Sequence, residues 1–95
     1  MIRGRRIAFD YGDARTGVAI CDPDGILASP LCVLESKSRD FVKNIAALLH
    51  EHEPITIFIG NPLNMSGNTG ESAAKVEQFV AELQAITDIP IQLID

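Results

Sequence analysis

The segment over residues 6–22, which reads RIAFDYGDARTGVAICD, constrains the fold more than any other part of the chain. Two short apolar runs, residues 7–9 and 18–21, flank a polar corner that begins at Asp10 and contains two glycines. Apolar runs joined by a turn rich in glycine and aspartate are typical of a β-hairpin. The segment therefore predicts a strand, a corner and a returning strand, with a carboxylate where the first strand ends.

The rest of the chain adds one more strand and then alternates twice between helix and strand. The expected strands are, in chain order, residues 5–10, 16–21, 26–34, 55–59 and 89–95. Each expected helix carries one apolar face, which consists of Phe41, Ile45, Leu48 and Leu49 in the first helix and of Ala73, Val76, Phe79, Val80 and Leu83 in the second. We expect Ser36 or Ser38 to cap the first helix, and Asn68 or Thr69 to cap the second.

This order of elements predicts an α/β domain with a mixed five-stranded sheet. The first three strands are joined by tight turns and form an antiparallel meander, in which Pro30 places the third strand at the sheet edge or breaks it at Ser29. A helix between two strands implies a right-handed crossover and parallel pairing. The apolar, β-branched run over residues 55–59 is therefore expected inside the sheet, beside the first strand.

The last expected strand, residues 89–95, has the pattern of a buried strand, and the sequence stops there. A sheet that ends on such a strand leaves one face uncovered, which is unusual for packed layers. We therefore expect residues 1–95 to form a single domain that lacks its C-terminal part. An uncovered apolar strand edge also predicts that two copies of the chain pair as a homodimer.

The length, composition and net charge of the chain limit the kinds of protein that it can be. The 95 residues suit one domain, and no apolar run approaches the roughly 20 residues that cross a bilayer. No signal-peptide core follows the N-terminal arginines, which predicts a cytoplasmic protein with no membrane partner. Cys21 and Cys32 are then expected to be free thiols, and a disulfide between adjacent strands is the less favoured alternative. The net charge of −5, taken alone, weighs against nucleic-acid binding.

Asp10 is the first candidate for a functional residue. A carboxylate on a rigid strand suits a divalent cation, because hard cations take oxygen ligands that are held in place. From the residues alone, a purely structural role in the turn stays open. Arg15, at the same corner, either faces solvent or contacts a phosphate. The loop over residues 60–70 leaves a buried strand where ligands of α/β sheets gather, but it also fits a plain connection.

Three stretches together are similar to a known protein family. They are residues 9–19 (FDYGDARTGVA), residues 60–67 (GNPLNMSG) and residues 93–95 (LID). In sequence and spacing they resemble the YqgF family of Holliday-junction resolvases, which is also proposed to process the precursor of 16S ribosomal RNA. The resemblance implies a ribonuclease H-like fold and the metal-dependent hydrolysis of phosphodiesters, with Mg²⁺ or Mn²⁺ as the cofactor. The implied substrates are a four-way DNA junction or the precursor ribosomal RNA.

The resemblance also assigns roles to individual residues. Asp10 would be the first catalytic carboxylate and a metal ligand. The nucleic-acid contacts would be Arg15 and Asn64, and the residues that shape the corner and the second loop would be Gly12, Gly17, Gly60, Pro62 and Gly67. The family's second carboxylate, a glutamate expected after Asp95, is not in the sequence. The resemblance therefore implies that this 95-residue piece binds metal weakly and does not cleave.

Two other interpretations stay open. An Asp-x-Gly corner that opens a three-stranded meander also begins the actin-like and sugar-kinase ATPase domains, where the corner wraps nucleotide phosphates. The acidic charge is compatible with a module that binds or scaffolds without catalysis. Separate titrations with ATP and with a labelled four-way junction distinguish the nuclease, the ATPase fragment and the scaffold.

Overall fold

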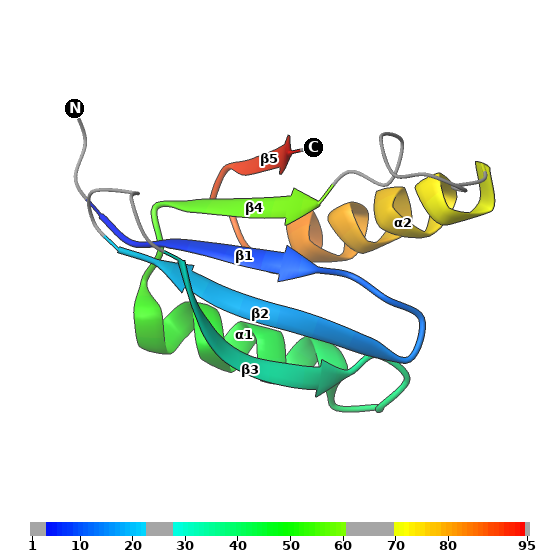
Figure 1. Ribbon diagram of the computed structural model, residues 1–95, viewed down its shortest axis with the longest axis horizontal. Helices are drawn as coiled ribbons and strands as arrows, with labels where there is room; N and C mark the ends of the chain where they lie inside the picture. Colours follow the sequence, from blue (N-terminus) through cyan, green and yellow to red (C-terminus); the bar gives the residue numbers. More distant parts are fainter. Residues whose placement is uncertain (1–3, 23–27, 61–69, 95) are drawn as a thin grey trace.

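The computed structural model describes residues 4–22, 28–60 and 70–94, and the side chains of all of these except 70–72. The described residues form five strands and two helices (Figure 1). Their bounds are, in chain order, β1 Arg6–Asp10, β2 Arg15–Cys21, β3 Ala28–Glu35, α1 Phe41–His52, β4 Thr56–Gly60, α2 Gly70–Ile86 and β5 Ile91–Ile94. Every strand predicted from the sequence is therefore present, with its ends shifted by at most two residues.

The strands make one mixed sheet in the order β3-β2-β1-β4-β5. β1 pairs with β2, and β2 with β3, in antiparallel orientation, as expected for strands joined by short turns. β4 runs parallel to β1, and β5 runs parallel to β4, because a helix carries the chain back before each of them. The predicted α/β architecture, a meander followed by α-β-α-β, is confirmed, and β4 lies beside β1 as predicted.

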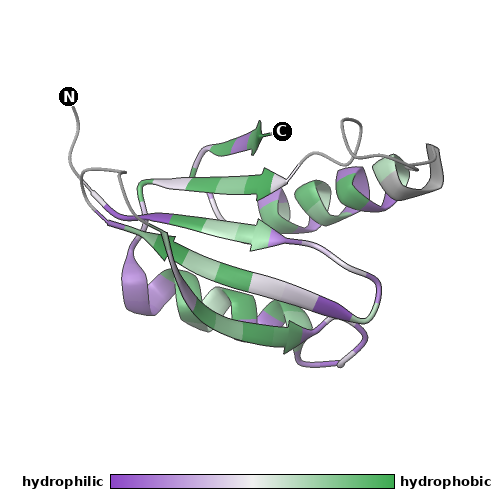
Figure 2. Cartoon of the chain, viewed as in Figure 1, coloured by the Kyte–Doolittle hydropathy of each residue, from purple (hydrophilic) through white to green (hydrophobic). Residues whose placement is uncertain are grey.

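Both helices cover the same face of the sheet (Figure 1). The core lies between that face and the helices, and consists of Ile7, Phe9, Val18, Phe41, Ile45, Leu49, Ile57, Ile59, Val76, Phe79 and Leu83. These residues alternate along the strands and recur on one side of each helix, which is the pattern of a sheet covered on one face. Among the described residues no helix covers the opposite face, which we call the open face (Figure 1). Figure 2 shows that hydrophobic residues run along most of the sheet.

Pro30 lies in an edge strand, as predicted. The register of β3 against β2 shifts there, since Val18 is opposite Cys32 whereas the next residue, Ala19, is opposite Pro30. Leu31 is therefore an extra residue in β3, the arrangement of a β-bulge. A bulge at an edge tolerates a residue that has no N–H to donate, so the strand continues past Ser29 and is not broken there.

The ends of α1 differ in part from the prediction. Its N-cap is Asp40, which makes no side-chain capping bond. The Ser38 hydroxyl accepts a hydrogen bond from the Asp40 N–H at 3.1 Å, before the helix begins, and the Ser36 hydroxyl is used elsewhere. The helix ends where Glu53 takes a left-handed conformation with φ of 46° and donates its N–H to the Leu49 carbonyl. The cap residues proposed for α2, Asn68 and Thr69, lie outside the described residues.

The prediction that the last strand is buried is wrong for the structure described here. Ile91 is half-buried, but Gln92, Leu93 and Ile94 are exposed. β5 is an edge strand that pairs with β4 alone among the described strands. Apolar residues reveal that a segment is a strand, but they do not reveal whether a neighbour covers it, so the two features have to be predicted separately.

Two further findings concern the cysteines and the length of the helices. Cys21 and Cys32 are free thiols, as predicted, and both are half-buried. Neither of the helices that the structure describes is long and apolar enough to cross a membrane.

Candidate active site

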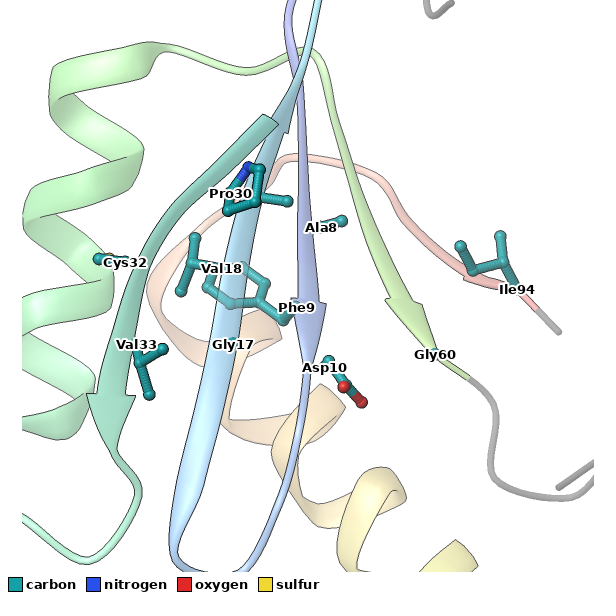
Figure 3. Close-up of a pocket in the computed structure, with 11 residues that line it drawn as sticks. Ala8, Phe9, Asp10, Gly17, Val18, Pro30, Cys32, Val33, Gly60 and Ile94 are labelled. Carbon is teal, nitrogen blue, oxygen red and sulfur yellow. The ribbon is translucent and has the colours of Figure 1, made fainter. Parts of the chain in front are cut away.

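Asp10 is the last residue of β1, the middle strand of the sheet. Ile7 and Phe9 of this strand are buried against the helices, so the alternation of strand side chains places Ala8 and Asp10 on the open face. The Asp10 side chain is exposed, and the residue directly opposite on β2 is Gly17. Figure 3 shows the Asp10 side chain at the end of β1. A central strand therefore holds one accessible carboxylate at its carboxyl end.

A cavity of about 380 Å³ adjoins this carboxylate. It is lined by Ala8, Phe9, Asp10, Gly17, Val18, Ala19, Pro30, Cys32, Val33, Gly60 and Ile94 (Figure 3). We call it the Asp10 cavity. Small residues of β1, β2 and β4 form much of its lining, and Asp10 is the one carboxylate among the described lining residues. The cavity therefore offers space beside a single charged group.

The glycines near Asp10 differ in what an added Cβ would meet. A Cβ on Gly12 would lie 2.5 Å from the Arg15 carbonyl oxygen, a backbone atom that cannot move aside easily. A Cβ on Gly17 would lie 3.8 Å from the Asp10 Cβ, which is an ordinary contact. A Cβ on Gly60 would meet nothing within 4 Å. Gly12 is thus required by the corner itself, whereas Gly17 and Gly60 leave room in the Asp10 cavity.

A chain of hydroxyl groups anchors the corner to the turn after β3. Thr16 is fully buried, and its Oγ1 lies 2.8 Å from the Ser36 Oγ. The Ser36 hydroxyl donates to the Gly12 carbonyl at 2.6 Å, and the Ser36 N–H donates to the Ala14 carbonyl at 3.0 Å. Ser36, one of the two residues predicted to cap the first helix, therefore bonds two backbone carbonyls of the corner that follows Asp10.

An ion pair anchors the same corner to α2. The Lys75 Nζ donates to the Asp13 Oδ2 at 2.8 Å. This hydrogen bond holds the pKa of Asp13 below its ordinary value. Arg15, the candidate phosphate contact, is exposed at the start of β2, where it is opposite Glu35 of β3. Thus Asp13 acts as a local partner of Lys75, and Arg15 is accessible at the end of the sheet where Asp10 lies.

Tyr11, which follows Asp10, packs into the aromatic part of the core. Its ring stacks on Phe79 with a centroid separation of 4.8 Å and an interplanar angle of 28°. It also meets Phe41 edge-on, with the ring centroids 6.3 Å apart. The ring is therefore used for packing between the sheet and the helices, and this geometry favours a structural role over stacking on a base.

The described residues supply only part of a metal site. Asp10 is a hard oxygen donor of the kind that Mg²⁺ and Mn²⁺ take. No group of three His, Cys, Asp or Glu side chains that could hold a metal ion occurs in the described part of the chain. Asp22 follows β2, whose last residue Cys21 is opposite Arg6, so it lies at the other end of the sheet. Asp10 therefore fits as one ligand of a site that needs further donors.

Three residues of the predicted second loop, Pro62, Asn64 and Gly67, lie outside the described residues. Gly60 is described, and it lines the Asp10 cavity at the end of β4. Sequence reasoning missed the roles of Thr16, Ser36 and Lys75. The burial of Thr16 could have been predicted, because Thr16 lies two residues before Val18 and therefore faces the same, inward side of the strand. A buried hydroxyl in turn needs a hydrogen-bond partner. The partner itself is far away in sequence, so no local pattern identifies it.

Comparison with known proteins adds independent information on this site. The chain is 44% identical to a protein of Streptomyces coelicolor named "Putative pre-16S rRNA nuclease", over the whole of this chain and 58% of that protein. The fold is similar to that of Thermus thermophilus RuvC in complex with a Holliday junction substrate, with a TM-score of 0.64 and 16% identity over 96% of this chain and 64% of that one. It is also similar to Archaeoglobus fulgidus Pelota, with a TM-score of 0.60 and 12% identity over 98% of this chain and 26% of that one.

The two structural likenesses have low sequence identity and show the fold alone. They confirm the predicted ribonuclease H-like fold, for which RuvC is the relevant neighbour. A fold by itself does not single out one activity. The sequence comparison is more specific, although this chain spans little more than half the length of its Streptomyces coelicolor relative. A sequence model of one nuclease family, described as RuvX, Holliday junction resolvase, matches residues 4–95. The chain therefore belongs to the RuvX family, which confirms the resemblance to YqgF proteins seen in its sequence.

Proposed function

We propose that this chain carries part of the active site of a divalent-metal-dependent endonuclease that hydrolyses phosphodiesters of structured nucleic acid. The substrate is a four-way DNA junction or the 5′ end of the precursor of 16S ribosomal RNA. One observation supports this proposal above the others: in a chain of the RuvX family, the middle strand ends in an exposed carboxylate beside a cavity on the open face.

Asp10 takes the role of first catalytic carboxylate and metal ligand in this proposal. A bound Mg²⁺ or Mn²⁺ supplies a more acidic water and a counter-charge for the departing oxygen. Asp10 would supply one ligand to that ion, from a strand whose backbone is fixed by neighbours on both sides. Gly17 and Gly60 leave the space beside the carboxylate open for a phosphate group. Arg15 and Asn64 contact the nucleic acid.

The 95-residue chain binds metal weakly and does not cleave on its own. Metal ions of this kind are held by several carboxylates together, and the described residues offer no group of three potential ligands. Among the described residues the chain contributes one ligand to such a site, Asp10, so the free energy of metal binding is small. The cytoplasmic location stays a prediction from the sequence.

Metal binding is tested by titrating Mn²⁺ into the ¹⁵N-labelled chain and following the amide signals by NMR. Paramagnetic broadening should begin at Asp10 and its neighbour Gly17, at millimolar rather than micromolar Mn²⁺, and should disappear in Asp10→Asn. The matched control is Asp88→Asn, which removes an exposed carboxylate before β5, at the other end of the sheet. Broadening that is unchanged in Asp10→Asn would contradict the proposed role of Asp10.

Cleavage and binding are tested with the same variants. The wild-type chain should bind a labelled four-way junction or a precursor 16S fragment without cutting it in the presence of Mn²⁺. Metal-dependent cuts that vanish in Asp10→Asn would refute the proposed inactivity while supporting the nuclease assignment. Binding of ATP in place of either nucleic acid would favour an ATPase fragment. Binding of none of the three would favour a scaffold.

The open edge of β5 is proposed to pair two copies of the chain. Leu93 and Ile94 are 47% and 39% exposed, and an edge strand presents unpaired backbone groups to a partner. Replacing Leu93 with lysine places a charge on that edge and should shift the chain toward monomer. Light scattering over a wide concentration range measures this, and a wild-type chain that stays monomeric throughout would rule the dimer out.

A further inference from the structure

The corner after Asp10 is held by the sheet on one side only. The pairing of β1 with β2 ends where Asp10 is opposite Gly17, so residues 11–14 lie beyond it. On the β2 side of the corner the sheet continues, because Arg15 and Thr16 pair with β3. On the β1 side none of the described strands pairs with the backbone that follows Asp10. The position of one side of the corner relative to the other therefore depends on contacts outside the strand pairing.

Ser36, in the turn after β3, makes such a contact with two different groups. Its backbone N–H donates to the Ala14 carbonyl at 3.0 Å, directly before Arg15. Its hydroxyl donates to the Gly12 carbonyl at 2.6 Å, two residues after Asp10. One residue thus bonds both the chain that leaves Asp10 and the chain that enters Arg15.

Asp10 and Arg15 lie on the same face of the sheet. Arg15 is exposed, and it is in phase along β2 with Gly17 and Ala19, which line the Asp10 cavity. Gly17 is directly opposite Asp10, and Arg15 lies about 7 Å from Gly17 along the strand. A carboxylate suits a metal ion, and a guanidinium group suits phosphate oxygens. The open face therefore presents two complementary groups to one phosphodiester.

We propose that Ser36 is a positioning residue, whose hydroxyl fixes Arg15 relative to Asp10 so that both act on one phosphodiester of the nucleic acid. This inference rests on the proposed function for the roles of Asp10 and Arg15, and it adds the residue that sets the geometry between them. The phosphodiester then bridges the Arg15 guanidinium group and the metal ion at Asp10. Binding of the metal ion therefore strengthens binding of the nucleic acid, and the reverse.

A purely stabilising role for the Ser36 hydroxyl predicts a different result. Tyr11 stacks on Phe79 and Asp13 pairs with Lys75, so two other contacts hold the corner against α2. If these contacts fix the backbone after Asp10, removal of the Ser36 hydroxyl lowers stability but leaves Arg15 where it is. The distance from Asp10 to Arg15 therefore distinguishes positioning from stabilisation.

This distance is measured by NMR with Mn²⁺ bound at Asp10, because paramagnetic broadening falls steeply with distance from the ion. The measured quantity is the broadening of the Arg15 backbone and side-chain N–H signals divided by that of the Gly17 amide signal. This ratio depends neither on how much metal is bound nor on the fraction of unfolded chain. Broadening that remains in the Asp10→Asn background is subtracted, since Glu35, opposite Arg15, is another carboxylate that can attract the ion.

In Ser36→Ala the ratio should fall below the range of the controls, because the released corner lets Arg15 move away from Asp10. Ser36→Thr keeps a hydroxyl and should restore the wild-type ratio. Ser36→Cys has a similar size but a weak donor, so it should resemble Ser36→Ala, and it replaces that variant if the alanine chain does not fold. Circular dichroism of each variant confirms that it is folded.

Two controls match the chemical change without releasing the corner. Ser38→Ala removes a hydroxyl from the same turn, where it accepts a hydrogen bond from the Asp40 N–H. Thr16→Val removes the other hydroxyl of the pair and leaves the bond from Ser36 to Gly12 in place. Both variants should keep the wild-type ratio.

The consequence for ligand binding is measured by fluorescence anisotropy of a labelled four-way junction, with and without Mn²⁺. Mn²⁺ should tighten binding by the wild-type chain several-fold, because the ion and Arg15 hold the same phosphodiester. This gain should be lost in Arg15→Gln, in Asp10→Asn and in Ser36→Ala, and should be kept in Ser38→Ala.

Two results overturn the inference: a wild-type ratio in Ser36→Ala, or a wild-type chain whose affinity for the junction does not rise with Mn²⁺. Asp10 still remains the metal ligand after either result, provided that the broadening disappears in Asp10→Asn. Failure of the proposed function has a different signature. In that case the broadening is the same with and without Asp10→Asn, and the role of Ser36 falls together with that of Asp10.

Discussion

Thr16 and Ser36 are twenty residues apart in sequence, and their hydroxyl oxygens lie 2.8 Å apart at the corner that follows Asp10. The direction of this hydrogen bond follows from its surroundings. Ser36 has one hydroxyl proton and gives it to the Gly12 carbonyl, which can only accept. Thr16 must therefore donate to Ser36. The fully buried Thr16 hydroxyl thus donates to Ser36, and the Ser36 hydroxyl donates to the backbone of the corner.

The direction of these two hydrogen bonds predicts that mutations of Thr16 and of Ser36 have unequal effects on stability. Ser36→Ala leaves both the buried Thr16 hydroxyl and the Gly12 carbonyl without their partner, and should lower the free energy of unfolding by about 1–3 kcal/mol. Thr16→Val keeps the shape and leaves the bond from Ser36 to Gly12 intact, so its cost should be smaller. The double variant should cost less than the sum of the two, because valine no longer needs the serine. Urea unfolding followed by circular dichroism measures all three, and a Thr16→Val cost larger than that of Ser36→Ala would contradict the assigned direction.

The sequence predicted the fold well because its signals are local. Apolar runs, turn residues and helical spacing gave each element, and the alternation of strands and helices gave the parallel pairing of β4 with β1. Asp10 could be selected for the same reason, since it ends an apolar run beside a turn. The supports of its corner could not be predicted, because Ser36 and Lys75 reach it from 24 and 62 residues away. The exposure of β5 was also missed, since burial depends on neighbours that a strand's own residues do not reveal.

The glycines around Asp10 should respond differently to the same added methyl group. Gly12→Ala forces a Cβ to within 2.5 Å of the Arg15 carbonyl oxygen, so the corner must shift and the protein should lose stability by about 1–3 kcal/mol. Gly60→Ala meets nothing within 4 Å and should change stability by less than about 0.5 kcal/mol. Thermal unfolding of the two variants side by side measures the difference. Equal losses would show that the corner does not depend on a close approach at Gly12.

The pairing of Asp13 with Lys75 predicts a dependence on pH. Because the hydrogen bond from Lys75 lowers the pKa of Asp13 in the folded chain, the pair stabilises the fold above the ordinary aspartate pKa of about 4. That stabilisation is lost as the pH falls through the lower pKa of the folded state. An NMR titration of the side-chain carboxyl carbons measures the pKa directly. In Lys75→Gln the Asp13 pKa should rise toward its ordinary value, and an unchanged Asp13 pKa in that variant would contradict the assigned cause.

The stacking of Tyr11 on Phe79 predicts that its ring matters for stability more than its hydroxyl does. Tyr11→Phe keeps the stacked ring and should be within about 0.5 kcal/mol of the wild type. Tyr11→Ala removes a half-buried aromatic side chain from contacts with Phe79 and Phe41, and should cost about 2 kcal/mol, less than for a fully buried ring. Chemical denaturation measures both. A Tyr11→Ala variant that is as stable as the wild type but binds the labelled junction poorly would instead favour a role in stacking on bases.

The space opposite Asp10 predicts that stability and metal binding can be separated at Gly17. A Cβ at this position makes an ordinary 3.8 Å contact with the Asp10 Cβ, and a non-glycine residue loses less backbone freedom when it joins a strand. Gly17→Ala should therefore unfold no more easily than the wild type, and Gly17→Val should also fold, because valine suits a strand. The larger valine side chain occupies the cavity beside the carboxylate, so Mn²⁺ broadening at Asp10 should persist in Gly17→Ala and decline in Gly17→Val. Equal broadening in both variants, with the fold intact, would show that a metal ion reaches Asp10 from a direction that this cavity does not provide.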